Sequence, residues 1–186
     1  MKPIILASQS PRRKQLLEWA EIDFEVVVSE TDESFPSDLN SSEIAIHIAT
    51  EKALAVQYKT NSSKIILAAD TIVVLENEIL GKPISKTQAI ETLQKLSGKI
   101  HEVITGVCLI SDNKRVVFAE KTYVEFNNLT LNEIEFYINK YKPFDKAGAY
   151  AIQEWIGVVG IKKIEGDFYN VMGLPINKVY KELQNF

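Results

Sequence analysis

The segment from Ile65 to Lys86, with the sequence IILAADTIVVLENEILGKPISK, decides how the rest of the chain is interpreted. Its first five residues are apolar, which is typical of a buried strand that reaches the edge of a sheet, and this run stops at Asp70-Thr71. Apolar and β-branched residues resume at Ile72–Leu75, and Glu76-Asn77 then predicts the turn of a short hairpin. A carboxylate in such surroundings is costly unless it has a partner. We therefore expect a cation beside Asp70.

The size of the chain indicates one domain. It has 186 residues, of which 46% are hydrophobic, enough to bury one core or to form two small lobes that share a sheet. No linker separates independent domains. We expect a single domain over residues 1–186, with two lobes around one central cleft.

Charge and cysteine content narrow the partners and the compartment. The net charge of −4 gives no basic surface for nucleic acid or for an anionic membrane. The single cysteine, Cys108, excludes an internal disulfide and lies in an apolar run, so we expect a buried structural thiol. The N-terminus does not resemble a signal peptide, and no apolar run reaches the roughly 20 residues of a membrane span. These features predict a cytoplasmic protein.

Strand and helix patterns alternate along the chain. This order predicts an α/β protein with a mixed, twisted sheet flanked by helices, although periodicity does not fix the strand order. The expected helices are Pro11–Ala20, Ser41–Tyr58, Ser85–Leu96, Thr130–Asn139 and a last one that starts at Pro175. Besides the central hairpin, the expected extended segments are 3–7, Phe24–Val28, His101–Ser111, Arg115–Phe126, Ala149–Ile152 and Val158–Ile164.

The first strand and helix enclose a candidate anion site. Ser10 is a good N-cap and Pro11 suits the first helical position, so free backbone N–H groups point beyond the turn. Arg12 and Arg13 oppose the helix dipole in this first turn, and a bound anion would resolve the conflict. The alternative is a solvated pair of surface arginines.

Polar residues at three places suit phosphoryl chemistry if they converge. These are Ser8–Arg13, Asp70-Thr71 with Lys82, and Asp145-Lys146 with Gln153. Basic groups would hold a polyphosphate, while carboxylates such as Glu33 and Asp70 would bind a divalent cation or orient a water. Without further evidence, Lys52 needs no functional role, because a lysine in the C-terminal half of a helix suits the helix dipole. We expect His47 to be a partly buried histidine that binds no ligand. The sequence contains no Walker A loop and no zinc-binding pattern.

Six motifs resemble, in order, those of the Maf family. The resemblance covers nearly the whole chain and implies a fold shared with the inosine triphosphatases (Maf/Ham1). It also implies a nucleoside triphosphate pyrophosphatase that cleaves between the α and β phosphates. The motifs are Ala7–Arg13, Glu51–Ala53, Ala69–Thr71, Gly81–Pro83, Asp145–Gln153 and Gly173–Pro175.

The resemblance also implies roles for individual residues. Asp70 is similar to the family's catalytic base, and Glu33 with Asp70 would bind Mg²⁺ or Mn²⁺. The positions that would hold the triphosphate are Ser8, Arg12, Arg13, Lys52 and Lys82, and those that would select the base are Arg12, Thr71 and Gln153. The segment Ala149–Gln153 resembles the branch that acts on dTTP and UTP, and modified pyrimidine triphosphates are further expected substrates. The glutamine amide offers both a donor and an acceptor, as the imide edge of thymine or uracil needs.

The chain departs from the family pattern at two places. Glu154-Trp155 replaces a small, glycine-containing pair, and Asp167 stands where serine is common.

Two alternatives to the pyrimidine triphosphate pyrophosphatase stay open. The first alternative is the same reaction on a modified purine triphosphate such as 7-methyl-GTP. The second is a nucleotide-binding regulator of septum formation that does not turn its ligand over. A homodimer also remains open.

Overall fold

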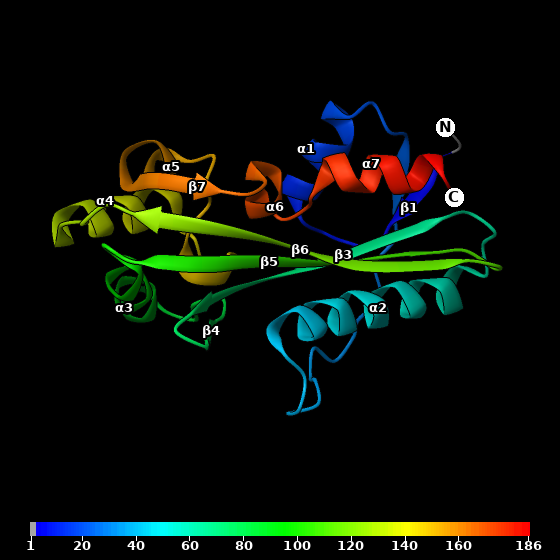
Figure 1. Cartoon of the computed structure of the whole chain (residues 1–186), viewed down its shortest axis with the longest axis horizontal. Coiled ribbons are helices and arrows are strands. Elements are labelled where there is room, and N and C mark those ends of the chain that lie inside the picture. Colours follow the sequence, from blue (N-terminus) through cyan, green and yellow to red (C-terminus); the bar gives the residue numbers. More distant parts are fainter. Residues whose placement is uncertain (1–2) are drawn as a thin grey trace. The chain divides into compact units, whose positions relative to one another are not determined.

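The protein is an α/β structure with a mixed sheet of seven strands, described for residues 3–186 in a computed structural model (Figure 1). The sheet order is β2-β1-β3-β5-β6-β7, and β4 pairs with β3. The strands are β1 (Ile4–Leu6), β2 (Phe24–Val26), β3 (Ile66–Leu75), β4 (Glu78–Leu80), β5 (Ile100–Ile110), β6 (Arg115–Phe126) and β7 (Ile161–Glu165). The helices are α1 (Pro11–Trp19), α2 (Ser41–Thr60), α3 (Lys86–Leu96), α4 (Leu131–Tyr141), the 3₁₀ helix η1 (Ala147–Ala149), α5 (Trp155–Gly160), α6 (Phe168–Met172) and α7 (Ile176–Gln184).

The chain divides into two compact units. Unit 1 comprises the chain up to Thr71, Thr105–Glu120 and Gly173–Phe186. Unit 2 comprises Ile72–Ile104 and Lys121–Met172. The cleft expected from the sequence stays a prediction.

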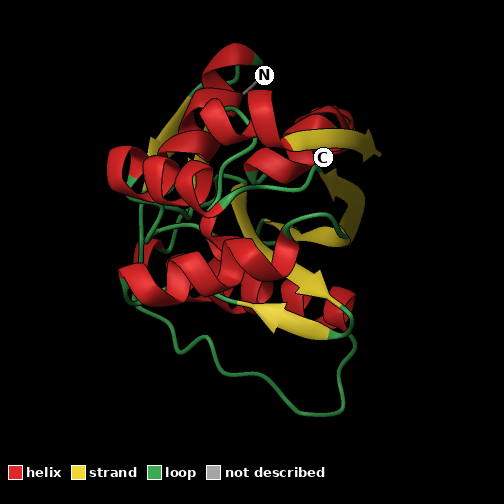
Figure 2. Ribbon diagram, turned by 90° about the vertical axis from the view of Figure 1, so that its left-hand side faces the viewer, coloured by secondary structure: helices red, strands yellow, loops and turns green. Residues whose placement is uncertain are grey.

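Unit 1 is built on the parallel pairing of β1 with β2 and with β3. Figure 1 shows α2 on one side of its strands and α1 with α7 on the other. Gly106 on β5 permits the close approach of α2, because a Cβ atom there would lie 2.2 Å from the backbone of Ala45. A long irregular segment, residues 27–40, precedes α2 and forms the extended loop at the bottom of Figure 2.

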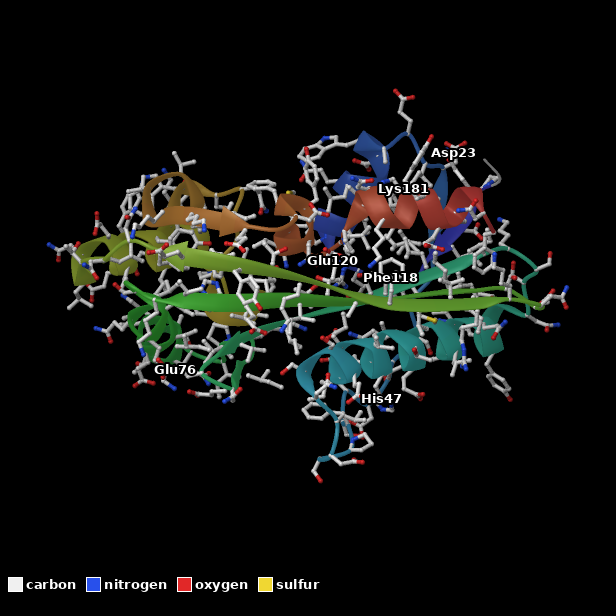
Figure 3. The ribbon with its side chains drawn as sticks, viewed as in Figure 1. Asp23, His47, Glu76, Phe118, Glu120 and Lys181 are labelled. Atoms are coloured by element: carbon white, nitrogen blue, oxygen red, sulfur yellow. The ribbon has the colours of Figure 1, made fainter. Side chains whose placement is uncertain are left out.

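Small and β-branched residues fill the core between α2 and these strands. The cluster includes Ala49 and Ala53 from α2, Ile66 from β3 and Cys108 from β5. Burial raises the pKa of the Cys108 thiol, as expected for a structural cysteine. Figure 3 shows His47 on the side of α2 that faces away from the strands, where it is partly exposed.

Unit 2 contains two antiparallel strand pairs, β3 with β4 and β6 with β7. The turn between β3 and β4 has positive φ at both Glu76 (51°) and Asn77 (70°), as in the two-residue hairpin turns that match strand twist. Helix α3 packs against α4 and η1. Among residues 3–186, no helix combines the length and the apolar character needed to cross a bilayer.

The main helices and the long strands confirm the predictions. All five expected helices are present within two residues at the ends that the sequence defined, and Ser10, Ser85 and Thr130 each cap one of them. Only half of the predicted box at Ser85 forms, because the Gln88 side chain accepts from Ile84 N at 2.7 Å.

Three local predictions were wrong. The central strand does not end at Asp70-Thr71: β3 runs through them, because both side chains find partners without a break in the strand. Ala149–Ile152 is not a strand, since it leaves a 3₁₀ helix with Ala149 at φ 59° and enters a turn. The strand expected at Val158–Ile164 begins only at Ile161.

Two short helices account for the last of these errors and for an omission. Helix α5 occupies Trp155–Gly160, where two valines imitate a strand pattern. Helix α6 follows Asp167, whose Oδ1 accepts from Tyr169 N at 2.8 Å in the manner of an N-cap. The sequence predicted only a turn at Gly166-Asp167.

Candidate active site

The turn between β1 and α1 is held by its own serines. Ser10 caps α1 and accepts from Arg13 N at 3.5 Å, while the Ser8 hydroxyl accepts from Ser10 N at 3.2 Å. Ser8 is buried, with 8% of its surface exposed. The turn therefore presents a fixed helix N-terminus, the anion-binding geometry that the sequence indicated.

Arg13 connects this turn to two other segments of unit 1. Its Nε donates to the Gly173 carbonyl oxygen at 2.8 Å. One terminal nitrogen donates to the Ser8 hydroxyl and the other to the Thr71 hydroxyl, each at 3.1 Å. A planar guanidinium can meet three acceptors in fixed directions, whereas an ammonium cannot, so the choice of arginine follows from this geometry.

Carboxylates near Arg13 offset the cost of its burial. Desolvation lowers the pKa of the Arg13 guanidinium, the charge of Asp70 raises it, and the neighbouring Arg12 lowers it again. The charge of Glu33 also raises this pKa. The opposing charges on Asp70 and Glu33 thus belong to the same electrostatic environment as the first turn of α1.

Two participants in this network were not among the predicted site residues. Thr105 shares a hydrogen bond of 2.9 Å with the Thr71 hydroxyl, and it is buried among the apolar residues of β5. Gly173 adopts φ 115°, which favours glycine, and this conformation accompanies its carbonyl bond to Arg13. A threonine in an otherwise apolar strand and a glycine before Leu174-Pro175 were the available signals.

Lys52 supplies the cation expected beside Asp70, which the sequence did not identify by residue. Its Nζ lies 2.7 Å from Asp70 Oδ1 and 2.7 Å from Glu33 Oε1. The Asp70 side chain is 13% exposed and that of Glu33 is 50% exposed, so the pair Lys52–Asp70 is the more shielded of the two. The lysine comes from α2 and Glu33 from the long loop, and Lys52 bonds to β3 at Asp70, one of the two partly exposed residues of that strand.

Asp70 and Glu33 are the carboxylates that could hold a divalent cation. Both direct an oxygen at one positive atom, Lys52 Nζ, so their charges already converge. Across residues 3–186 no group of three or more acidic, histidine or cysteine side chains forms a complete metal cage. Two carboxylates fit Mg²⁺ or Mn²⁺ better than zinc, because Mg²⁺ commonly takes one or two carboxylates and completes its shell with phosphate oxygens and water.

The remaining candidates belong to unit 2. Lys82 is exposed in the segment after β4, and Gln153 is exposed in the turn before α5. Lys146 is buried and pairs with Asp145 at 2.8 Å and with Glu154 at 3.6 Å, which indicates a structural ion pair. The structure thus brings Ser8, Arg13, Thr71, Asp70, Lys52 and Glu33 together in unit 1.

The fold places the chain in the Ham1-like class. The Ham1 protein of Staphylococcus aureus superposes with a TM-score of 0.58 and 18% identity over 99% of both chains. A HAM1 protein from Coxiella burnetii gives a TM-score of 0.53 and 14% identity over the full length of both chains. These identities support the shared fold alone.

Within this class the chain belongs to the Maf family, described as Maf-like protein, whose sequence model matches residues 3–186. A dTTP/UTP pyrophosphatase of Bacillus cereus (strain G9842) is 51% identical over 186 residues, covering 100% of this chain and 96% of that protein. A dTTP/UTP pyrophosphatase of Parabacteroides distasonis is 48% identical over 184 residues, covering 98% of this chain and 95% of that protein. The family resemblance inferred from the motifs is confirmed.

The geometry around Arg13 predicts the effect of a conservative substitution. Arg13→Lys keeps the charge but leaves acceptors at Ser8, Thr71 and Gly173 without donors, and we expect a loss of about 2–4 kcal/mol in the free energy of unfolding in urea. The matched control is Arg12→Lys, on the neighbouring partly exposed residue, with an expected loss below about 1 kcal/mol. Equal losses for the two variants would contradict the role assigned to Arg13.

Proposed function

We propose that this protein is a nucleoside triphosphate pyrophosphatase that hydrolyses dTTP and UTP to the monophosphate and pyrophosphate. The names of its relatives at 48% and 51% identity support the reaction and the pyrimidine substrates. The observation that carries the proposal is the Asp70 carboxylate, held at 2.7 Å from Lys52 inside an otherwise buried strand. A protein that only binds nucleotides has no need of a carboxylate at such a costly position.

The turn before α1 would bind phosphate oxygens. Ser8 already accepts two hydrogen bonds, so its hydroxyl proton is directed to a further acceptor such as a phosphate oxygen. The backbone N–H and the guanidinium of Arg12 would add charge-assisted bonds at the helix N-terminus. Arg13 would act mainly by holding this turn in place, and Lys52 and Lys82 stay candidates for the triphosphate.

Asp70 would serve as the general base. Within the described residues its hydrogen bond from Lys52 goes to Oδ1, which leaves Oδ2 to accept a proton from water. In the proposed step the water oxygen forms a bond to the α phosphorus, and the bond from this phosphorus to the bridging oxygen breaks. Pyrophosphate leaves with that bonding electron pair, and the proton of the water passes to Asp70.

Glu33 and Asp70 would hold the divalent cation. When bound, such a cation polarises phosphoryl oxygens and neutralises the charge that develops during the reaction. The Lys52 ammonium lies 2.7 Å from each of these carboxylates and offsets one of their two negative charges, so a net negative charge is left for a cation.

Gln153 is the residue proposed to select the base. Its amide can donate to one group and accept from another, as thymine and uracil require. The Thr71 hydroxyl is already engaged with Arg13 and Thr105, so it would influence base choice by holding its neighbours.

The first test is pyrophosphate release from a panel of nucleoside triphosphates with Mg²⁺ or Mn²⁺. Asp70→Asn should lower turnover of dTTP and UTP by at least about 100-fold, because the amide keeps the shape of the side chain but not its basicity. Binding of a non-hydrolysable dTTP analogue should persist. The control is Asp23→Asn, which changes an exposed carboxylate of unit 1 (Figure 3) and should leave turnover unchanged.

Three outcomes of this panel would revise the proposal in different ways. Full activity of Asp70→Asn would remove Asp70 as the base. Turnover of purine triphosphates alone would keep the reaction and overturn the pyrimidine assignment. Binding without turnover by the wild-type protein would favour the regulator.

The second test concerns Gln153. Gln153→Glu replaces a donor and acceptor with an acceptor-only carboxylate, and kcat/KM for dTTP and UTP should fall by about 10- to 100-fold. Gln94→Glu makes the same change at an exposed position of α3 and should have no effect. Unchanged relative rates on dTTP, UTP and the other triphosphates in Gln153→Glu would contradict base reading by this residue.

A further inference from the structure

A tight turn in unit 2 carries Gln153. Glu154 N donates to the Ala151 carbonyl oxygen at 3.1 Å, so Ala151 and Glu154 are the two ends of a four-residue turn with Gln153 in its third position. The Glu154 carbonyl oxygen accepts from Gly157 N at 2.9 Å at the start of α5. At the other end, Ala151 N bonds to a side chain from outside the turn.

One hydroxyl bonds to both ends of this turn. Tyr137 comes from α4, is fully buried, and accepts from Ala151 N at 3.1 Å. The same hydroxyl donates to a carboxylate oxygen of Glu154. A single oxygen thus fixes the first and last residues of the turn, with the exposed Gln153 side chain projecting from between them.

Neighbouring contacts hold the segment on both sides. Lys146 lies 3.6 Å from the Glu154 carboxylate and supplies its counter-charge. Before the turn, the Tyr150 hydroxyl lies 2.7 Å from His101 Nε2 in a buried pair. Burial lowers the pKa of His101 to about 4, so this pair is neutral near pH 7.

After the turn, α5 approaches so closely that only glycine fits. A Cβ atom on Gly157 would lie 1.7 Å from the Ile152 carbonyl oxygen. The turn is therefore packed closely against α5 and bonded to Tyr137 from α4. Among residues 151–154, Gln153 is the exposed one.

We propose that Tyr137 and Glu154 form a clamp that pre-positions the Gln153 amide for the base, which makes both of them positioning residues for specificity. This inference rests on the proposed pyrimidine triphosphatase function. It also gives a role to Glu154, one of the residues that depart from the family pattern. A turn that is already held in one conformation loses little conformational entropy when the base binds. In a loosened turn only a fraction of the molecules has the binding conformation, and the apparent affinity for the base falls by that fraction.

The experiment measures kcat and KM for dTTP, UTP and CTP in Tyr137→Phe. This variant keeps the ring and removes the shared hydroxyl. KM for dTTP and UTP should rise by about five- to twentyfold, and the preference over CTP should fall, while kcat stays within about threefold of the wild type, because base contacts are equally present before and during the reaction. Tyr141→Phe is the matched control: its ring stacks on Tyr137 at 5.1 Å, and its KM should not change.

A second pair of variants tests the other end of the turn. Glu154→Ala removes the acceptor and should reproduce the rise in KM, whereas Glu154→Gln keeps an oxygen for Tyr137 and should restore most of the wild-type KM. These variants also keep the test valid if Tyr137→Phe folds poorly. Unchanged KM and selectivity in both Tyr137→Phe and Glu154→Ala would overturn the clamp, as would a loss of kcat alone.

Amide hydrogen exchange separates failure of the clamp from failure of the proposed function. The Ala151 amide should exchange at least about tenfold faster in Tyr137→Phe than in the wild type, with or without any turnover of nucleotides. If the wild-type protein hydrolyses no pyrimidine triphosphate, the proposed function fails while this measurement still tests the clamp. Identical exchange in the two proteins would overturn it.

Discussion

The ion pair between Asp70 and Lys52 is the constraint on which the candidate site depends. Strand β3 is buried except at Asp70 and Thr71, so a carboxylate at this position requires a cation within hydrogen-bond distance. Lys52 meets this requirement from α2, and the small alanines of that helix and Gly106 of β5 allow it to approach. The packing of unit 1 thereby fixes the chemistry of its polar residues.

Arg13 gives the same unit a second, independent link. Its guanidinium joins the turn after β1, the middle of β3 and the segment before α7, three parts that are far apart in sequence. Arg12 and Arg13 thus have different roles in this account, although the sequence alone does not distinguish them. The three side-chain bonds of Arg13 go to acceptors of the protein itself, whereas Arg12 is the arginine proposed for direct contact with phosphate.

Local signals were sufficient where a residue acts on its own helix or turn. Ser10, Thr130 and the Glu76-Asn77 turn behaved as their types predict, and the demand of Asp70 for a cation identified a real interaction. The sequence could not name Lys52 as that cation, because the pairing depends on tertiary packing. The same reason hid the bonds of Arg13 to Gly173 and of Tyr137 to Ala151, whose partners lie far apart in the chain. Short valine-rich α5 was read as a strand because periodicity does not separate helix from strand over six residues.

The most direct test of the account is the fate of the oxygen that water contributes to the products. Hydrolysis of dTTP in H₂¹⁸O with Mg²⁺, followed by mass spectrometry, should give dTMP that carries one labelled oxygen and pyrophosphate that carries none. This result is what attack of an Asp70-activated water on the α phosphorus predicts. Label in the pyrophosphate, or products consisting of dTDP and labelled phosphate, would contradict it.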